Sequence, residues 1–165
     1  MKMSRRIEPA GGQESVWDYP RPPRVEATAE VVEIWLGGSA IAQSSNAYRV
    51  LETSHPPTYY VRMKDFVEGA LRPVPGSSYC EFKGIAQYFD LVDGGSVASR
   101  AGWTYPSPTR GFEQLLNYVA VMPGLVDKCL VDGELVRPQA GNFYGGWITD
   151  RVVGPFKGEP GTMGW

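Results

Sequence analysis

The sequence predicts a mostly β protein, and three observations support this prediction. The chain contains 20 glycines and 14 prolines among its 165 residues, which favours many turns over long helices. Short segments rich in β-branched and aromatic residues recur along it. Turn sequences of the Gly-Gly and Asp-Gly kind separate several of these segments, as they do in hairpins. We therefore expect a single domain of coiled antiparallel sheets with one short helix.

The first strands are expected in the N-terminal third of the chain. Residues 31–36 read Val-Val-Glu-Ile-Trp-Leu, a composition typical of a strand. Gly37-Gly38 follows and supplies the positive φ of a tight turn. Residues 40–42 return from this turn, and residues 48–51 continue the sheet.

The only segment with helical spacing is residues 64–71, where positions 66, 67, 70 and 71 are apolar. This spacing predicts a helix of about two turns, ended by Arg72-Pro73-Val74-Pro75-Gly76. Further strands are expected over residues 85–92 and 97–103, joined by Asp93-Gly94-Gly95. The clearest hairpin lies at Asp132-Gly133, because Asp-Gly is a type I′ turn pair.

The composition divides the chain into three parts. Residues 1–15 are polar and aperiodic, and we expect a disordered tail there. Residues 16–140 form the domain, beginning with a proline-rich arm that carries Trp17 and Tyr19. Residues 141–165 are rich in glycine but strongly aromatic. We expect this extension to pack on the domain and to bury Tyr144, Trp147 and Phe156.

Charge and cysteine content narrow the range of partners. The net charge is −2 and the pI is about 5.5, so no nucleic-acid or anionic-membrane partner is expected. No apolar run approaches the roughly 18–20 residues of a membrane helix, and the N-terminus lacks the apolar region of a signal peptide. Cys80 and Cys129 lie far apart outside any C-x-x-C motif. These features predict a cytoplasmic protein with reduced thiols, either a monomer or a homodimer.

The segment that concentrates ionisable groups is residues 49–61, which contain Glu52, Tyr60 and the only histidine of the chain, His55. Pro56-Pro57 follows the histidine and fixes φ at both positions. The carboxylate and the imidazole are therefore held on a stiff corner. Such rigid supports are typical of functional sites.

Other motifs give weaker indications. One histidine and two distant cysteines cannot build a structural zinc site of four Cys or His ligands, so we expect no metal and no cofactor. Residues 154–161, Gly-Pro-Phe-Lys-Gly-Glu-Pro-Gly, superficially resemble a phosphate loop. Their lysine is misplaced, their prolines remove backbone donors, and no helix is expected after them.

We predict one cavity that gathers residues from the corner and from two later strands. Glu52 would be the general base or hydrogen-bond acceptor, Lys83 would stabilise negative charge, and His55 would be the pH-sensitive acid or orienter. Cys80 is the candidate nucleophile, although a buried thiol without a role is the alternative. The aromatic wall is assigned to Tyr60, Tyr88, Trp103, Tyr105 and Trp147.

The chain resembles domain-of-unknown-function family 427, which is also labelled nucleotidyltransferase-like. This resemblance implies a β-tent fold, shared with methionine sulfoxide reductase B and the ligand-binding domain of cereblon. Those relatives hold zinc through paired C-x-x-C motifs, which this chain lacks. Glu81 stands where the family more often has proline, and the extension is found in a subset of the family. The matching stretches cover about residues 16–123 and are Trp17-Asp18-Tyr19-Pro20-Arg21-Pro22-Pro23, residues 49–57 with Tyr59-Tyr60, Cys80-Glu81-Phe82-Lys83-Gly84 with Ala86 and Tyr88, and Trp103-Thr104-Tyr105-Pro106.

Three functions follow from these patterns. The first is a small-molecule enzyme that uses Glu52, His55 and Lys83 for acid–base chemistry. The alternative is a non-catalytic binding module with an aromatic cage. Nucleotidyl transfer is the third, but it requires two or three carboxylates to hold Mg²⁺. After Gly38-Ser39 only Glu52 occupies the expected window, and the sole Asp-x-Glu motif lies at a predicted turn, residues 132–134.

Overall fold

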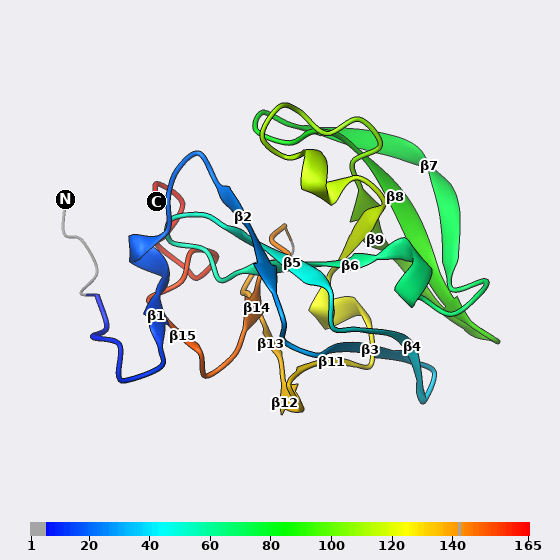
Figure 1. Ribbon diagram of the computed structural model, residues 1–165, viewed down its shortest axis with the longest axis horizontal. Coiled ribbons are helices and arrows are strands. Elements are labelled where there is room, and N and C mark those ends of the chain that lie inside the picture. Colours follow the sequence, from blue (N-terminus) through cyan, green and yellow to red (C-terminus); the bar gives the residue numbers. More distant parts are fainter. Residues whose placement is uncertain (1–5, 142) are drawn as a thin grey trace.

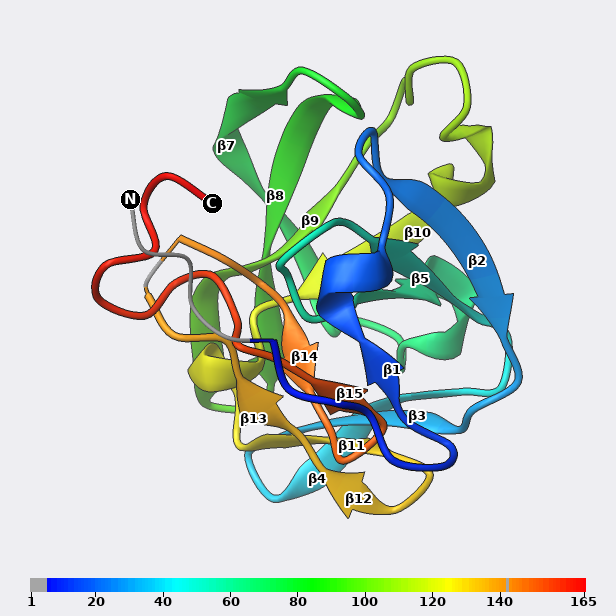
Figure 2. The ribbon, with the colours of Figure 1, turned by 90° about the vertical axis from the view of Figure 1, so that its left-hand side faces the viewer.

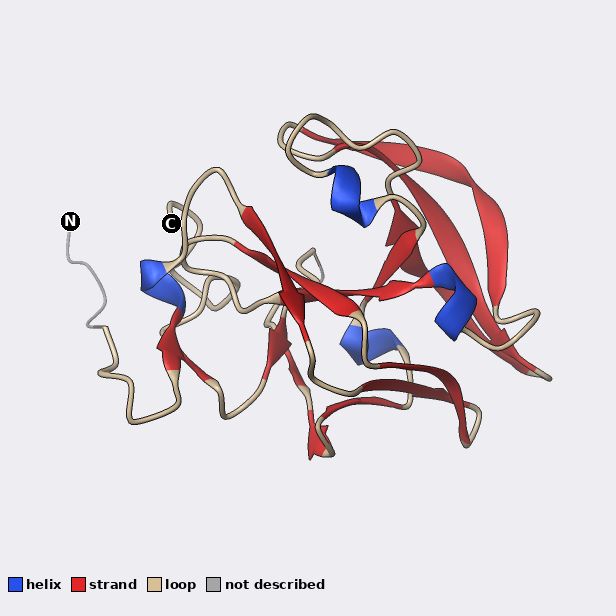
Figure 3. Cartoon of the chain, in the orientation of Figure 1, coloured by secondary structure: helices blue, strands red, loops and turns tan. Residues whose placement is uncertain are grey.

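The computed structural model describes residues 6–141 and 143–165 and confirms a mostly β protein (Figures 1 and 3). Its largest element is a seven-stranded antiparallel sheet with the order β2-β5-β6-β10-β9-β8-β7. These strands are β2 (Arg24–Thr28), β5 (Ala47–Leu51), β6 (Thr58–Arg62), β10 (Tyr118–Val121), β9 (Ser96–Thr104), β8 (Gly84–Asp93) and β7 (Leu71–Cys80). A four-stranded sheet has the order β12-β11-β3-β4. Its strands are β12 (Glu134–Leu135), β11 (Lys128–Val131), β3 (Val32–Leu36) and β4 (Ser39–Ser44).

Two small sheets attach the ends of the chain to this body. A parallel pair joins β1 (Glu14–Ser15) to β15 (Val152–Val153), and an antiparallel pair joins β13 (Arg137–Pro138) to β14 (Trp147–Ile148). The helical segments are single 3₁₀ turns, namely η1 (Val16–Asp18), η2 (Met63–Asp65), η3 (Glu113–Leu115) and η4 (Pro123–Leu125). Within the described ranges, no helix has the length and apolar character needed to cross a bilayer.

The main core lies between the two large sheets. Strands β3, β4 and β11 contribute Ile34, Ile41 and Cys129, which pack against side chains of β6, β8, β9 and β10. Successive side chains of a strand point to opposite faces of a sheet. On β6, Tyr59 therefore joins this core, while Tyr60 joins a second apolar cluster on the opposite face of the seven-stranded sheet. That second face carries the candidate site.

The three predicted turns are confirmed. Gly37-Gly38 joins β3 to β4, residues 93–95 join β8 to β9, and Asp132-Gly133 joins β11 to β12. The last pair has φ values of 49° and 81°, as a type I′ turn requires. The hairpin signals therefore positioned six of the fifteen described strands correctly.

The helix predicted over residues 64–71 is wrong. Only η2 is helical there, Phe66 bridges to Ala42, and β7 begins at Leu71. Phe66 and Ala70 are buried as a helical face would be, but Val67 is exposed. Gly69 has φ +83°, a left-handed conformation that interrupts a helix.

Strand β7 contains the two prolines that were expected to end the helix. Proline cannot donate a ladder hydrogen bond and is found on edge strands or at bulges. Strand β7 is an edge of the seven-stranded sheet, and its pairing with β8 shifts register between Val74 and Ser77. Pro75 lies within this irregularity. The edge position therefore explains why a proline-containing segment forms a strand.

Both ends of the described chain contact the body. Ile7 N donates to Gly154 O at 3.1 Å, and β1 pairs with β15, so residues 6–15 differ from the expected disordered tail. Residues 1–5 lie outside the described residues. The extension after residue 140 lies beside β1 (Figures 1 and 2). It buries Trp147 completely and half-buries Tyr144 and Phe156.

A buried arginine connects these ends to the large sheet. The side chain of Arg49, on β5, is 0% exposed. Its Nη1 and Nη2 atoms donate to the two carboxylate oxygens of Glu14 at 3.0 and 3.3 Å, and Nη2 also contacts Glu26. Arg151 of the extension donates to the same Glu14 at 3.1 Å and lies 2.9 Å from Glu30. One guanidinium thus links β2, β5 and the N-terminal segment, with the extension attached through Glu14.

The same contacts determine the ionisation of Glu14. Burial alone would raise its pKa, but hydrogen bonds from Arg49 and Tyr19 and the charge of Arg151 together lower that pKa from 4.5 to about 2. Glu14 therefore remains ionised in the folded protein well below the pH at which the unfolded chain binds a proton.

We expect Arg49→Met to lower the free energy of unfolding by about 3–5 kcal/mol, because it leaves Glu14 and Glu26 without their buried partner. Chemical denaturation at neutral pH measures this change. Arg24→Met is the matched control, because Arg24 is exposed and pairs with the same Glu26 at 3.3 Å. Loss of the exposed Arg24–Glu26 pair should lower the free energy of unfolding by no more than about 1 kcal/mol. Equal effects of the two substitutions would contradict the assigned role of Arg49.

We also expect the stability contribution of Glu14 to depend on pH. A carboxylate whose pKa falls from 4.5 to about 2 on folding stabilises the protein above pH 4.5 and loses this contribution as the pH falls toward 2. The difference in unfolding free energy between the natural protein and Glu14→Gln should therefore shrink over that window. Glu68→Gln, at an exposed position, should give a difference that is small at every pH. A pH-independent difference for Glu14→Gln would refute the role of its charge.

Candidate functional site

A cavity of about 610 Å³ lies on the face of the seven-stranded sheet opposite the main core. Strands β5, β6, β8 and β9 contribute Val50, Tyr60, Ala86 and Trp103 to its lining. Eight of the nine site residues predicted from the sequence line this one cavity. They are Glu52, His55, Tyr60, Cys80, Lys83, Tyr88, Trp103 and Tyr105.

Aromatic side chains form the wall of the cavity. Tyr88 on β8 and Trp103 on β9 are direct cross-strand neighbours, so their side chains lie on the same face of the sheet. The rings of Tyr60 and Tyr105 lie 6.5 Å apart. Burial raises the pKa of both phenols. They therefore contribute neutral, largely apolar surface to the cavity.

The corner between β5 and β6 places a carboxylate beside the imidazole. Glu52 Oε2 lies 3.2 Å from Arg21 Nε and 3.8 Å from His55 Nε2. Arg21 Nη2 also donates to the carbonyl of Thr53 at 2.9 Å, which fixes the guanidinium against the corner. Glu52 is therefore already paired with a cation from the proline-rich arm.

Gln139 determines the tautomer of the neutral His55 ring. The amide of Gln139 is oriented by two backbone groups, because Oε1 accepts from Gly146 N at 3.1 Å and Nε2 donates to Lys157 O at 2.7 Å. The second hydrogen of Nε2 is then directed to His55 Nδ1, 3.1 Å away. That ring nitrogen must accept, so the proton of the neutral imidazole is on Nε2.

The surroundings of His55 favour the neutral form of its imidazole. Burial lowers its pKa below 6.5; the charge of Glu52 opposes this change, and the charges of Lys157, Arg21 and Lys83 reinforce it. The imidazole is therefore neutral near neutral pH, with Nε2–H as its remaining donor.

Lys83 and Cys80 lie at the turn between β7 and β8. Cys80 is the last residue of β7, and Lys83 Nζ lies 5.8 Å from the centre of the Tyr105 ring. Gly84 begins β8 with φ +107°, and a Cβ atom there would lie 3.2 Å from Ser107 O. This glycine allows the turn to pass close to a neighbouring loop, so that Lys83 and the β8 side chains line the same cavity.

Trp147 is the one predicted ligand-binding residue that does not line the cavity. Its side chain is 0% exposed in the main core, its ring lies 5.0 Å from that of Tyr59, and its Nε1 donates to Val121 O at 3.0 Å. Tyr144 of the extension lines the cavity instead, with its ring 5.2 Å from His55. A large indole with a hydrogen-bonded N–H is well suited to a core position.

Sequence reasoning missed many residues of the cavity lining, and four of them carry polar groups that matter for its chemistry. Arg100, Gln139, Tyr144 and Lys157 line the cavity, although none lies in the segment around His55. The aromatic content of the extension was the only available signal, and it predicted burial of Tyr144 without placing it at a site. Gln139 carries no sequence signal at all, because its role depends on contacts with residues far along the chain.

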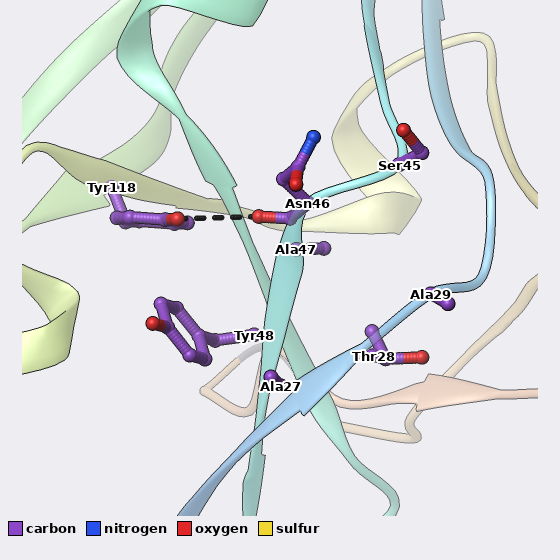
Figure 4. Close-up of a pocket in the computed structure, with 8 residues that line it drawn as sticks. All are labelled: Ala27, Thr28, Ala29, Ser45, Asn46, Ala47, Tyr48 and Tyr118. Carbon is purple, nitrogen blue, oxygen red and sulfur yellow. Dashed lines mark hydrogen bonds between the residues drawn. The ribbon is translucent and has the colours of Figure 1, made fainter.

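The structure also contains a second, smaller hollow. It measures about 340 Å³ and lies at the ends of β2 and β5 (Figure 4). Small side chains and two tyrosines line it, and Tyr118 donates through its hydroxyl to Asn46 O at 3.2 Å. Its described lining carries no charged side chain. The larger cavity therefore is the candidate site.

Metal-ligating side chains are dispersed. Across residues 6–141 and 143–165, no three His, Cys, Asp or Glu side chains are grouped so that they could hold a metal ion. Cys129, the second cysteine, is buried in the core, and burial raises the pKa of its thiol.

We expect Gln139→Glu to raise the pKa of His55, because a carboxylate beside Nδ1 favours the imidazolium that the amide donor disfavours. As the only histidine of the chain, His55 gives a single set of imidazole NMR signals. Titration should place the natural pKa below 6.5 and that of the variant above it. Gln43→Glu introduces the same charge at an exposed position on β4 and should leave the titration nearly unchanged. An unshifted titration in Gln139→Glu would contradict the assigned hydrogen bond.

Comparison with known proteins identifies one family. A family model described as a domain of unknown function (DUF427) matches residues 24–132. No curated protein matches the chain. The match includes β2 through β11 and most of the cavity lining, but it excludes Gln139, Tyr144 and Lys157 of the C-terminal part. Because it spans well over half of the 165 residues, the chain belongs to the DUF427 family.

Proposed function

We propose that the larger cavity binds a small molecule through its aromatic wall. The observation that supports this proposal is the convergence of Tyr60, Tyr88, Trp103 and Tyr105 on one cavity of about 610 Å³. Ligand pockets of roughly 300–1,000 Å³ with apolar and aromatic walls and a few polar groups are typical of small-molecule sites. A flat, partly unsaturated molecule would match such walls, because aromatic rings bind one another by offset stacking or edge contacts.

The geometry of the corner favours binding over the acid–base enzyme predicted from the sequence. Gln139 donates to His55 Nδ1, and Nε2 carries the proton, so the neutral ring has no free lone pair with which to act as a base. Arg21 pairs with Glu52 at 3.2 Å, which weakens this carboxylate as a proton acceptor. Both groups are better suited to orienting a ligand than to moving a proton.

Nucleotidyl transfer, the relation to β-tent proteins and a cytoplasmic location remain predictions. Cys80 lines the cavity, but among residues 6–141 and 143–165 its thiol has no hydrogen bond to a base that would activate it as a nucleophile.

We expect an aromatic probe such as phenylnaphthylamine to shift the imidazole NMR signals of His55 on titration, because the probe would occupy the cavity that this ring lines. Trp103→Ala should weaken the affinity by about tenfold, through loss of one large aromatic contact. Trp35→Ala is the matched control, because Trp35 is also half-buried but lies on β3, outside the cavity lining. It should leave the affinity unchanged.

Two outcomes would refute the proposed binding site. One is binding that leaves the His55 signals in place, which would put the probe elsewhere. The other is an equal loss of probe affinity in Trp103→Ala and Trp35→Ala, which would mean that a general loss of structure causes the weaker binding. Thermal unfolding of both variants separates the second outcome from a local effect.

A further inference from the structure

Three cations line the cavity, and each lies over a tyrosine ring. Lys83 Nζ is 5.8 Å from the ring centre of Tyr105, and Lys157 Nζ is 5.8 Å from that of Tyr144. The guanidinium carbon of Arg100 is 4.4 Å from the ring of Tyr88. Such cation–π contacts hold a cation in place without neutralising its charge.

None of these cations has an Asp or Glu partner in the part of the chain that the structure describes, although Lys157 Nζ donates to a main-chain oxygen of the last residue, Trp165. No Asp or Glu oxygen of those residues lies within 4.0 Å of Lys83, Lys157 or Arg100 side-chain nitrogens. The two carboxylates of the lining do not compensate for them. Glu52 is paired with Arg21, and Glu81 is exposed in the turn after β7. The cavity is therefore locally positive in a chain whose net charge is −2.

Two of the cations share the cavity with His55. Lys157 Nζ lies 5.8 Å from the centre of the Tyr144 ring, which is 5.2 Å from the His55 ring, and Lys83 lines the same cavity. Lys157 Nζ is further fixed by a hydrogen bond to Trp165 O at 2.9 Å. Arg100 is held at the β7 bulge instead, where its Nη1 donates to Pro75 O at 2.7 Å.

His55 adds a neutral donor to the same cavity. Its Nε2–H lies 3.8 Å from Glu52 Oε2, which is longer than a hydrogen bond. Since Nδ1 is occupied by Gln139, Nε2–H is the ring donor left for a ligand. Two ammonium groups and one neutral N–H donor are the groups that bind a carboxylate or phosphate.

We propose that the ligand of this cavity is a planar molecule carrying an anionic group, a carboxylate or a phosphate, which Lys83, Lys157 and His55 Nε2–H bind together. This inference rests on the proposed binding function and specifies its ligand class. Lys157 lies outside the matched residues 24–132. The C-terminal extension therefore supplies part of the anion specificity, in addition to one aromatic wall from Tyr144.

The test compares two probes that share an aromatic body and differ in charge. Anilinonaphthalene sulfonate should bind the full chain about tenfold more tightly than the uncharged phenylnaphthylamine. Lys83→Met and Lys157→Met should each remove most of this preference, because they should weaken the sulfonate probe much more than the uncharged one. Added salt should weaken only the sulfonate probe. Lys128→Met is the matched control, because Lys128 lies 4.7 Å over the ring of Trp35, outside the cavity.

The outcomes separate the two proposals. If both probes depend on Trp103 but bind equally, and neither lysine matters, the anionic ligand is refuted while the binding site stands. If neither probe depends on Trp103, the binding site itself is refuted. Displacement of the bound sulfonate probe by benzoate or by phenyl phosphate identifies the preferred anion, and benzyl alcohol serves as the uncharged reference. Equal displacement of the probe by all three compounds would overturn the inference. Unchanged midpoints of thermal unfolding ensure that the lysine variants are folded.

Discussion

The arrangement of the whole chain depends on the buried guanidinium of Arg49. A fully buried cation requires partners, because desolvation of an unpaired charge is costly. Those partners come from Glu14 before the domain and Glu26 on β2, and Glu14 in turn holds Arg151 of the extension. The electrostatic requirement of one side chain thus fixes both ends of the chain against the large sheet. The two-residue pairing of β1 with β15 would be weak without it.

Attachment of the extension has a consequence at the cavity. The extension carries Lys157 and Tyr144, and Gly146 and Lys157 orient the Gln139 amide through their backbone atoms. Because that amide fixes the tautomer of His55, residues outside the family match control the chemistry of a histidine inside it. Related chains with a different C-terminal part could keep the same sheet and corner yet present a different ring nitrogen to a ligand.

The sequence predicted those features that depend on neighbouring residues. Asp132-Gly133 determines its hairpin through local φ preferences, and the turn at residues 93–95 pairs β8 with β9. The register shift between Phe89 and Leu91, which the turn does not predict, brings Tyr88 opposite Trp103. The prediction of a helix over residues 64–71 was wrong, because helical spacing of apolar residues also arises when a loop buries Phe66 and Ala70 separately. The burial of Trp147 was predicted, but its position in the core could not be, because an indole buried in a core and one at a ligand site require the same composition. Gln139 depends on contacts 84 residues away in sequence, which no local pattern records.

The prolines of β7 have a consequence for the behaviour of the protein in a crowded solution. An edge strand offers unpaired N–H and C=O groups to any other extended chain, which makes it a site of aggregation. Strand β7 is ten residues long and lies at the edge of the sheet, so its exposure to such contacts is considerable. Pro73 and Pro75 each remove one donor, and the register shift beside them bends the strand. A second chain would therefore find an interrupted template there, and the long hairpin can extend from the body without nucleating cross-β assembly.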